Sequence, residues 1–325
     1  MSTIDTLSKS FLRDPEVVAN LCNIHFFPDS PIVRPQDLVA CPEESFIMLD
    51  RDGKKRRTLT RHRDVLKQCV LKSFAPDGKK KVFIGLEAQT KADWSMTLRV
   101  LIYDALSYLV QDAMGQDGRK GGPPGGSPPA KLVPVRTLVV FFGTGPWTAP
   151  TKMGDLLIQP NDWPGQSIDK NGIDVLSLSE LDDRQLEGSC DALKCVAKCL
   201  RYARDKQAMK KMLQEDELFS RVPNNVVDLV GVLLNVDIRK SRKKETTNMC
   251  QAIEELFADA RAEGRAEGEA KGRAEGEAKG RADGRVEDIC NIVFFFRQKR
   301  MSEKRIISSL VQIFSLKPEE ARSFL

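Results

Sequence analysis

Histidine is scarce in this chain of 325 residues, which contains only two, and its eight cysteines include no C-x-x-C pair. Structural zinc sites are built from closely spaced Cys and His ligands. A zinc site is therefore disfavoured. We interpret the cysteines as free thiols that pack as small hydrophobic residues.

Long hydrophobic runs are also missing. The longest, such as 138–142 and 293–296, have the length of core segments and fall short of a membrane span. Residues 1–5 show neither the basic nor the apolar region of a signal peptide. We therefore expect a cytoplasmic protein with no membrane partner.

Three common site signatures are absent as well: a P-loop, a G-x-G-x-x-G segment and a Ser-His-Asp arrangement. Charge, in contrast, is plentiful, at 30% of residues with a net value of +5. Basic clusters at 54–57 and 79–81 precede two acidic residues, Asp64 and Glu87. Such clusters fit contacts that neutralise nucleic-acid phosphates beside those residues. We interpret a third cluster, at 239–244, as solvated loop charge.

The most informative segment is the apolar run 82–86 followed by Glu87, Ala88 and Gln89. Such a run predicts a buried central strand, on which Glu87 and Gln89 share one face. Asp64 lies upstream, across a predicted turn at 75–78, so a hairpin would place it near Glu87. Two adjacent carboxylates need a proton or a metal between them, and Mg2+ prefers such oxygen ligands.

In this order, Asp64, Glu87 and Gln89 resemble the motifs of the PD-(D/E)XK nucleases. The chain is most similar to the recombination-promoting nuclease family, whose third motif carries Gln where many relatives have Lys. The resemblance covers nearly the whole chain and includes the charged Gly-Ala tail. Further matching segments are Asp5, 14–16, 90–99, 103–104 and 138–147.

The resemblance implies that Asp64, Glu87 and Gln89 are catalytic. Mg2+ or Mn2+ would be held by Asp64, Glu87 and the backbone carbonyl of Ala88. Asp5 is a further candidate that would reach the metal through a water, and it is equally suited to cap the first helix. Gln89 can orient a water through its amide but carries no positive charge to stabilise hydroxide.

DNA is the implied partner, with little sequence specificity expected. The candidate phosphate contacts are Lys79, Lys80, Lys81 and Arg99. Arg99 and Tyr103 lie on the helix after the motif, and the alternative is that they support the site rather than touch DNA. We interpret His62, next to Asp64, as incidental.

The expected fold is α/β, a restriction-endonuclease-like αβββαβ core with a helical C-terminal region. The hydrophobic periodicity supports this order. A flexible Gly/Pro loop is expected at 115–130. The predicted core elements are a helix at 4–22, strands at 46–49, 62–73 and 81–89, a helix at 93–112, a strand at 133–142 and one more strand at 173–178.

Four segments are expected along the chain: a nuclease-like core at 1–180, a helical extension packing on it at 181–260, a spacer at 261–285 and a small helical module at 286–325. The extension predicts helices near 189–213, 222–236 and 246–260. The spacer repeats every four residues and contains six glycines, each of which disfavours helix by roughly 0.5–1 kcal/mol, so we expect only partial helix. The last module is either a packing or homo-oligomerisation unit or a DNA-reading helical hairpin.

The sequence as a whole predicts a metal-dependent DNA endonuclease that hydrolyses phosphodiester bonds, linked through the family to DNA recombination or mobile elements. One alternative is a nuclease-fold protein that binds DNA without cutting it, because Gln89 supports weaker chemistry than lysine. A second alternative is a protein-interaction module built on the helical tail.

Overall fold

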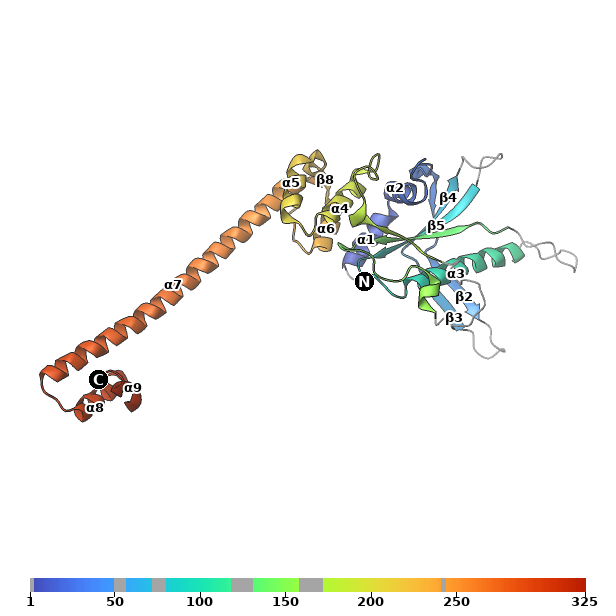
Figure 1. The fold of residues 1–325 in the computed structure, drawn as a ribbon. Coiled ribbons are helices and arrows are strands. Elements are labelled where there is room, and N and C mark those ends of the chain that lie inside the picture. The colour runs from blue at the N-terminus through green and yellow to red at the C-terminus, as the bar shows by residue number, and fades with distance from the viewer. Residues whose placement is uncertain (1–2, 50–56, 72–79, 118–130, 158–171, 241–243) are drawn as a thin grey trace, which may run out of the picture. The chain divides into compact units, whose positions relative to one another are not determined.

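The computed structural model describes residues 3–49, 57–71, 80–117, 131–157, 172–240 and 244–325. The predicted turn at 75–78, most of the predicted loop at 115–130, and Lys79 lie outside the described residues. The chain divides into two compact units, Met1–Ile253, here called the core unit, and Glu254–Leu325, the C-terminal unit (Figure 1).

A five-stranded mixed sheet organises the core unit, in the order β1-β4-β5-β6-β7. The β4 strand pairs antiparallel with β1 and β5, whereas β6 pairs parallel with β5 and β7. The mixed α/β class is therefore confirmed, as is the buried interior of β5. The strands are β1 (Leu38–Ala40), β4 (Val65–Leu71), β5 (Lys80–Gln89), β6 (Val135–Phe141) and β7 (Asp174–Ser177).

Helix α3 (Met96–Asp117) connects β5 to β6, because two parallel neighbours need a crossover rather than a tight turn. Met96, Val100, Tyr103 and Leu106 form its buried stripe, the pattern of an amphipathic helix that packs on a sheet. Met96 and Val100 pack with Val139 of β6. This packing fixes α3 beside the carboxyl end of β5, where Glu87 lies.

The predicted strand at 46–49 does not belong to the main sheet. It lies in β2 (Glu44–Leu49), which pairs antiparallel with β3 (Arg57–His62) in a separate two-stranded sheet. The sheet edge is instead β1, whose three residues are too few to show an alternating pattern. The predicted strand at 62–73 begins later than expected, at Val65, because Arg63 and Asp64 lie between the ends of β3 and β4 and belong to neither strand.

Helices complete the core unit. Helix α1 packs against β5 and α6, and α4 packs against α2 and α6. The predicted helix at 189–213 is divided into α4 and α5, because Asp205 caps a new helix by accepting hydrogen bonds from the N–H groups of Gln207 and Ala208. The helices are α1 (Thr3–Arg13), α2 (Pro15–Phe26), α4 (Asp191–Arg201), α5 (Lys206–Glu215) and α6 (Asn224–Leu234).

The short elements of the core unit are η1 (Pro35–Asp37), η2 (Met153–Leu156), η3 (Leu178–Glu180), η4 (Glu217–Ser220), β8 (Val222–Pro223) and β9 (Thr246–Thr247).

All eight cysteines are free thiols, but only Cys22, Cys69, Cys195 and Cys199 are buried. Cys290 is exposed, so its predicted packing role is wrong. Within the described residues, no helix combines the length and the apolarity that a membrane crossing requires.

Helix α7 (Met249–Gln298) runs unbroken through the repeat, where we expected only partial helix. The repeat places opposite charges four residues apart, and Arg281 and Glu277 form such a pair at 3.6 Å. Alanine at every fourth position has high helix propensity, so alanine and the charge pairs both favour helix, against the cost of the six glycines.

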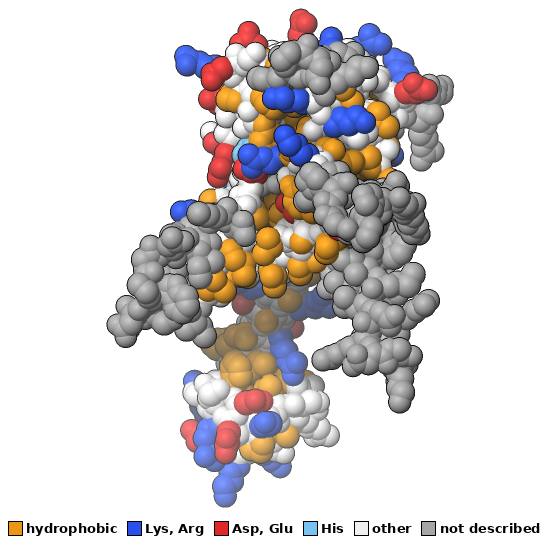
Figure 2. Space-filling model, turned by 90° about the vertical axis from the view of Figure 1, so that its right-hand side faces the viewer, with side chains coloured by type: hydrophobic (Ala, Val, Ile, Leu, Met, Phe, Trp, Pro, Cys, Tyr) orange, Lys and Arg blue, Asp and Glu red, His pale blue; other side chains and the backbone are white. Residues whose placement is uncertain are grey.

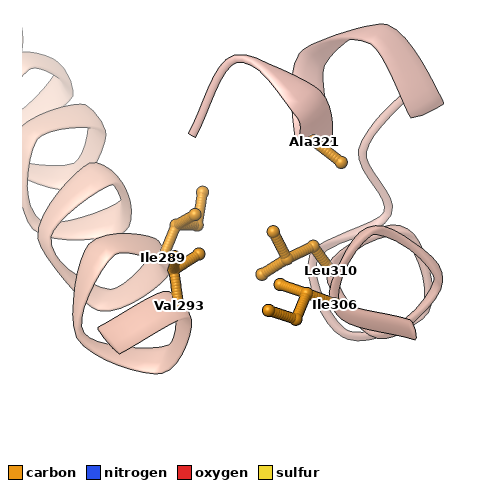
Figure 3. Close-up of a cluster of buried hydrophobic side chains, with 5 residues drawn as sticks. All are labelled: Ile289, Val293, Ile306, Leu310 and Ala321. Carbon is orange, nitrogen blue, oxygen red and sulfur yellow. The ribbon is translucent and has the colours of Figure 1, made fainter. Parts of the chain in front are cut away.

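The end of α7 forms a small core with α8 (Glu303–Phe314) and α9 (Pro318–Arg322). Figure 3 shows Ile289 and Val293 of α7 facing Ile306 and Leu310 of α8, with Ala321 of α9 beside them. The C-terminal unit therefore has a small hydrophobic core of its own.

Truncation after Ala260 is expected to leave the core unit folded. The α7 residues buried in that unit, Met249, Ala252 and Ile253, precede the cut, and the Met249 sulfur lies 3.8 Å from that of Cys195. Thermal unfolding followed by circular dichroism should show the core transition within about 3 °C of its position in the full chain. A control truncation after Asn248 removes Met249 and should lower it clearly. A large drop after the first truncation would contradict the division into units.

Candidate active site

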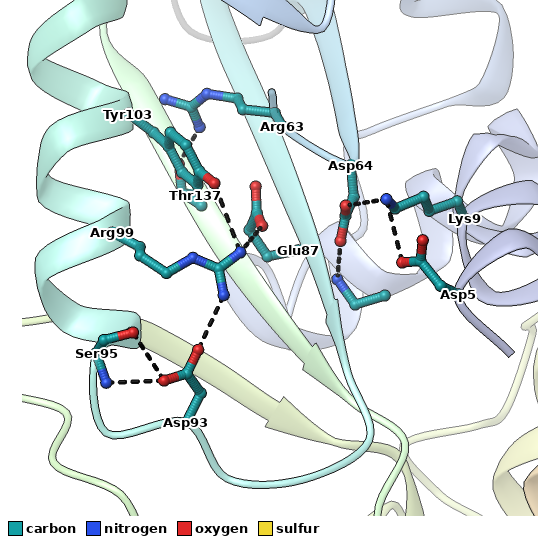
Figure 4. A network of polar contacts seen from close by, with 11 residues as sticks. Asp5, Lys9, Arg63, Asp64, Glu87, Asp93, Ser95, Arg99, Tyr103 and Thr137 are labelled. Carbon is teal, nitrogen blue, oxygen red and sulfur yellow. Dashed lines mark hydrogen bonds and ion pairs between the residues drawn. The ribbon is translucent and has the colours of Figure 1, made fainter. Parts of the chain in front are cut away.

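Asp64 and Glu87 are brought together by the pairing of β4 with β5. Val65 lies opposite Leu86, so Asp64, one residue earlier, reaches the end of β5. Its Oδ2 accepts a hydrogen bond from the N–H of Ala88 at 2.9 Å. Figure 4 shows the two carboxylates at neighbouring positions on the two strands. The hairpin expected from the sequence thus places Asp64 beside the E-x-Q segment.

Glu87 is completely buried. Its Oε2 lies 3.5 Å from Nη2 of Arg99, and its Oε1 is buried without a hydrogen-bond partner among the described residues. Burial is the main cause that raises the pKa of Glu87 to about 8, and repulsion from Asp64 is the second. The positive charges of Arg99 and Arg63 oppose this rise. A carboxyl group in this state favours either a proton or a cation beside it.

Arg99 is held by protein groups on α3 and on the segment before it. Its Nη1 lies 2.9 Å from Asp93 Oδ2, and its Nη2 lies 3.5 Å from the Tyr103 hydroxyl. Asp93 also accepts two hydrogen bonds from Ser95, both at 2.8 Å. Burial alone would raise the pKa of Asp93, but the hydrogen bonds from Ser95 and Arg99 lower this pKa overall. Arg99 therefore supports Glu87, which corresponds to the second of the two roles considered for it.

Lys9 is a site residue that the sequence analysis missed. From α1, its ammonium lies 3.0 Å from Asp64 Oδ1 and 3.1 Å from Asp5 Oδ1. Burial opposes its charge, but hydrogen bonds to Asp64 and Asp5 raise its pKa overall. Figure 4 shows α1 and α3 approaching the two strands from opposite sides. The available signal was the i, i+4 spacing of Asp5 and Lys9, which also occurs in many surface helices.

Arg63 is the second residue that was missed. It is almost fully buried and donates to Thr137 Oγ1 at 2.5 Å, to Asp104 Oδ1 at 2.9 Å and to Ser107 Oγ at 3.2 Å. Its guanidinium carbon lies 5.3 Å from the centre of the Tyr103 ring. Sequence alone gives no sign of this arrangement, because its partners lie 41 to 74 residues away.

Gln89 and the basic cluster occupy opposite ends of β5. Gln89 is half-buried two residues after Glu87, and its backbone carbonyl accepts the N–H of Phe142 at 2.7 Å. Lys80 and Lys81 are exposed at the start of the strand, where Lys80 lies opposite Leu71. Lys80 lies seven positions before Glu87 on the strand, a span of roughly 23 Å. The sequence proximity of this cluster to the carboxylates is therefore not proximity in space.

The donor groups that converge here fit a hard divalent cation in their chemistry, since they are carboxylate oxygens with one buried oxygen left unpartnered. They do not amount to a preformed cage. Among the described residues, no group of three or more His, Cys, Asp or Glu side chains is placed to hold a metal. Lys9 instead contacts Asp64.

Comparison of the chain with models of known protein families, with curated proteins and with solved structures gave no match. The chemistry of the site must therefore be argued from its own residues. Two carboxylates of different environment stand side by side, one completely buried and one paired with an ammonium. Such a pair is suited to bind a cation and to orient a water molecule.

Proposed function

We propose that this protein is a metal-dependent DNA endonuclease that hydrolyses phosphodiester bonds. The observation that carries the proposal is the placement of Asp64 beside the end of β5, where Glu87 keeps a buried and unpartnered Oε1. Burying an unsatisfied carboxylate oxygen is unfavourable, so this oxygen favours a proton or a cation beside it.

The order of the elements supports a restriction-endonuclease-like core. An antiparallel β4–β5 pair carries the two carboxylates, α3 follows, and β6 returns parallel to β5. In the nucleases that the motifs resemble, the catalytic carboxylates have the same places in an αβββαβ order. The family assignment and its link to recombination remain part of this proposal.

The proposed chemistry assigns a role to each residue around the carboxylates. Mg2+ or Mn2+ would be held by Asp64, Glu87 and the Ala88 carbonyl, and such an ion lowers the pKa of a bound water and stabilises charge on phosphate. Gln89, on the same strand face as Glu87, would orient the attacking water through its side-chain amide. Arg99 keeps Glu87 turned toward the site through their 3.5 Å contact.

DNA would be held mainly by electrostatic contacts with little dependence on sequence. On the face of the core unit drawn in Figure 2, Lys and Arg side chains lie among hydrophobic ones. Because Lys80 and Lys81 stand at the far end of β5, they would contact phosphates away from the cleaved bond. The C-terminal unit exposes Phe294, Phe295 and Ile313, which suit self-association into a homo-oligomer.

A second candidate is a protein of the same fold that binds DNA without cutting it. The contact between Lys9 and Asp64 favours this alternative, because an ammonium already neutralises one of the two carboxylates. Gln89 also lacks the charge of a lysine. The two candidates differ in a single measurable property, the cleavage of DNA.

Conversion of supercoiled plasmid to nicked and linear forms tests the proposal. We expect cleavage by the purified full chain with Mg2+ or Mn2+, and none with excess chelator. Asp64→Ala should reduce the rate by at least roughly a hundredfold, because it removes one of two metal-facing carboxylates. Asp155→Ala, which changes an exposed carboxylate outside the site, is the matched control. Cleavage that is equal in Asp64→Ala and wild type would refute the assignment.

A further inference from the structure

The charges around the proposed site are arranged unevenly. Position 89, at the end of β5, carries an amide where a lysine would place a positive charge beside the reacting phosphate. Three cationic side chains approach the carboxylate pair from other elements, namely Lys9, Arg63 and Arg99. They differ in how many of their donors are already engaged.

Two of these cations are held in place by other groups. The terminal nitrogens of Arg63 contact Thr137, Asp104 and Ser107 on the side of α3 and β6. Arg99 divides its terminal nitrogens between Asp93, Tyr103 and Glu87. The terminal nitrogens of both guanidinium groups are therefore already engaged by protein groups.

Lys9 has a different setting. Its ammonium bridges Asp5 and Asp64, at 3.1 and 3.0 Å, and only 16% of its side chain is exposed. The flexible four-carbon stem of lysine lets the charge shift by a few ångströms while one carboxylate still holds it. Asp5 lies on the same helix, one turn away, so it can keep this hold when Asp64 takes another partner.

We propose that Lys9 supplies to the scissile phosphate the positive charge that Gln89 does not carry, and that Asp5 is the anchor of Lys9 rather than a metal ligand. This inference rests on the proposed function of the same site. With a divalent cation held by Asp64, the ammonium of Lys9 would be repelled from Asp64. Lys9 would then keep its contact with Asp5 and turn its remaining N–H groups to a phosphate oxygen. The positive charge beside the phosphate thus comes from the lysine side chain on α1 instead of from a side chain on β5.

Two consequences of opposite sign follow for Lys9→Met, which keeps the apolar stem and removes the charge. Metal binding should tighten, because the competing cation beside Asp64 is gone. Cleavage at saturating metal should nevertheless slow by roughly a hundredfold, as expected for the loss of a group that stabilises charge in the transition state. Replacing a residue with only a structural role would not tighten metal binding while slowing cleavage.

The experiment measures Mn2+ affinity by electron paramagnetic resonance and plasmid nicking at saturating Mn2+ in the full chain. We expect Lys9→Met to bind Mn2+ several-fold more tightly and to cleave slowly, whereas Lys9→Arg, which keeps the charge, should retain most of the rate. Lys91→Met is the control, because Lys91 is an exposed lysine two residues after Gln89. Adding Gln89→Lys to Lys9→Met should restore cleavage.

Wild-type cleavage by Lys9→Met at saturating Mn2+ would overturn the inference. So would Mn2+ affinity that is unchanged or weaker in this variant, a result that can be read even if the wild type cleaves no DNA and the proposed function fails. Asp5→Asn should slow wild type but add nothing in the Lys9→Met background, and an added loss there would overturn the role of Asp5. If thermal unfolding shows that Lys9→Met is not folded, Lys9→Gln provides the same two readouts.

Discussion

Glu87→Gln is expected to abolish cleavage and to stabilise the metal-free protein above pH 8 by about 5 kcal/mol. This figure follows because the pKa of Glu87 rises from 4.5 to about 8 on folding and each pKa unit corresponds to about 1.4 kcal/mol. Glutamine keeps the shape and polarity of glutamate but cannot ionise. The pKa of Glu87 is raised to about 8, chiefly by burial and then by Asp64, against the attraction of Arg99 and Arg63. The native carboxyl group is thus most stable when protonated.

The direction of the pH effect follows from this shift. In the unfolded chain the carboxyl group ionises near its ordinary pKa of 4.5, whereas in the folded protein it keeps its proton up to about pH 8. The folded state therefore binds more protons between these values, and the stability of the wild type falls as pH rises through this window. The contribution is fully present below pH 4.5 and is lost above about pH 8.

Urea unfolding with chelator, at pH 5 and pH 9, measures the difference between Glu87→Gln and wild type. The stability that the wild type loses between pH 5 and pH 9 through ionisation of Glu87 should be retained by the variant. In the wild type, Mg2+ should reduce this loss by binding the ionised carboxylate. Glu180→Gln, an exposed position, is the matched control and should follow the wild type. Parallel pH profiles for wild type and Glu87→Gln would contradict the assignment.

Arg63→Met should destabilise the core unit by about 3–5 kcal/mol, the range for breaking a buried ion pair from one side. The change removes hydrogen bonds to Thr137, Asp104 and Ser107 and leaves Asp104 without its closest cation. Chemical denaturation of the full chain, followed by circular dichroism, measures the loss. Arg136→Met is the control: this side chain is 67% exposed and 3.8 Å from Asp174, so its loss should cost less than about 1 kcal/mol.

Gly85 provides an independent test of the same arrangement. A Cβ atom at this position would lie 2.2 Å from Arg63 Nη1 and 2.9 Å from Thr137 Oγ1, so Gly85→Ala should displace the guanidinium. The cost of Gly85→Ala should be clearly smaller in the Arg63→Met background, because the nearest clashing atom is absent there. Additive costs would show that Arg63 does not pass over Gly85 in solution.

The local parts of this protein could be predicted from its sequence. The run before Glu87 predicted a buried strand because period and composition are properties of consecutive residues, and that strand is β5. The predicted helix at 93–112 corresponds to α3, because hydrophobic periodicity is likewise a property of consecutive residues. To predict that Asp64 and Glu87 are neighbours, it was enough to assume one antiparallel pairing between two strands that follow each other in the chain.

Only the tertiary structure decided which cations surround these carboxylates. Lys9 reaches Asp64 from a helix 55 positions earlier in the chain, and Arg63 is held by partners on α3 and β6. Lys80 and Lys81, which looked close to Glu87 in the sequence, lie at the other end of its strand. Helix packing and sheet register set these distances, and both depend on buried contacts between segments far apart in the chain. The sequence therefore determined the pair of carboxylates, Asp64 and Glu87, and the fold determined which cations balance their charge, because electrostatic energy depends on distance in space and on burial.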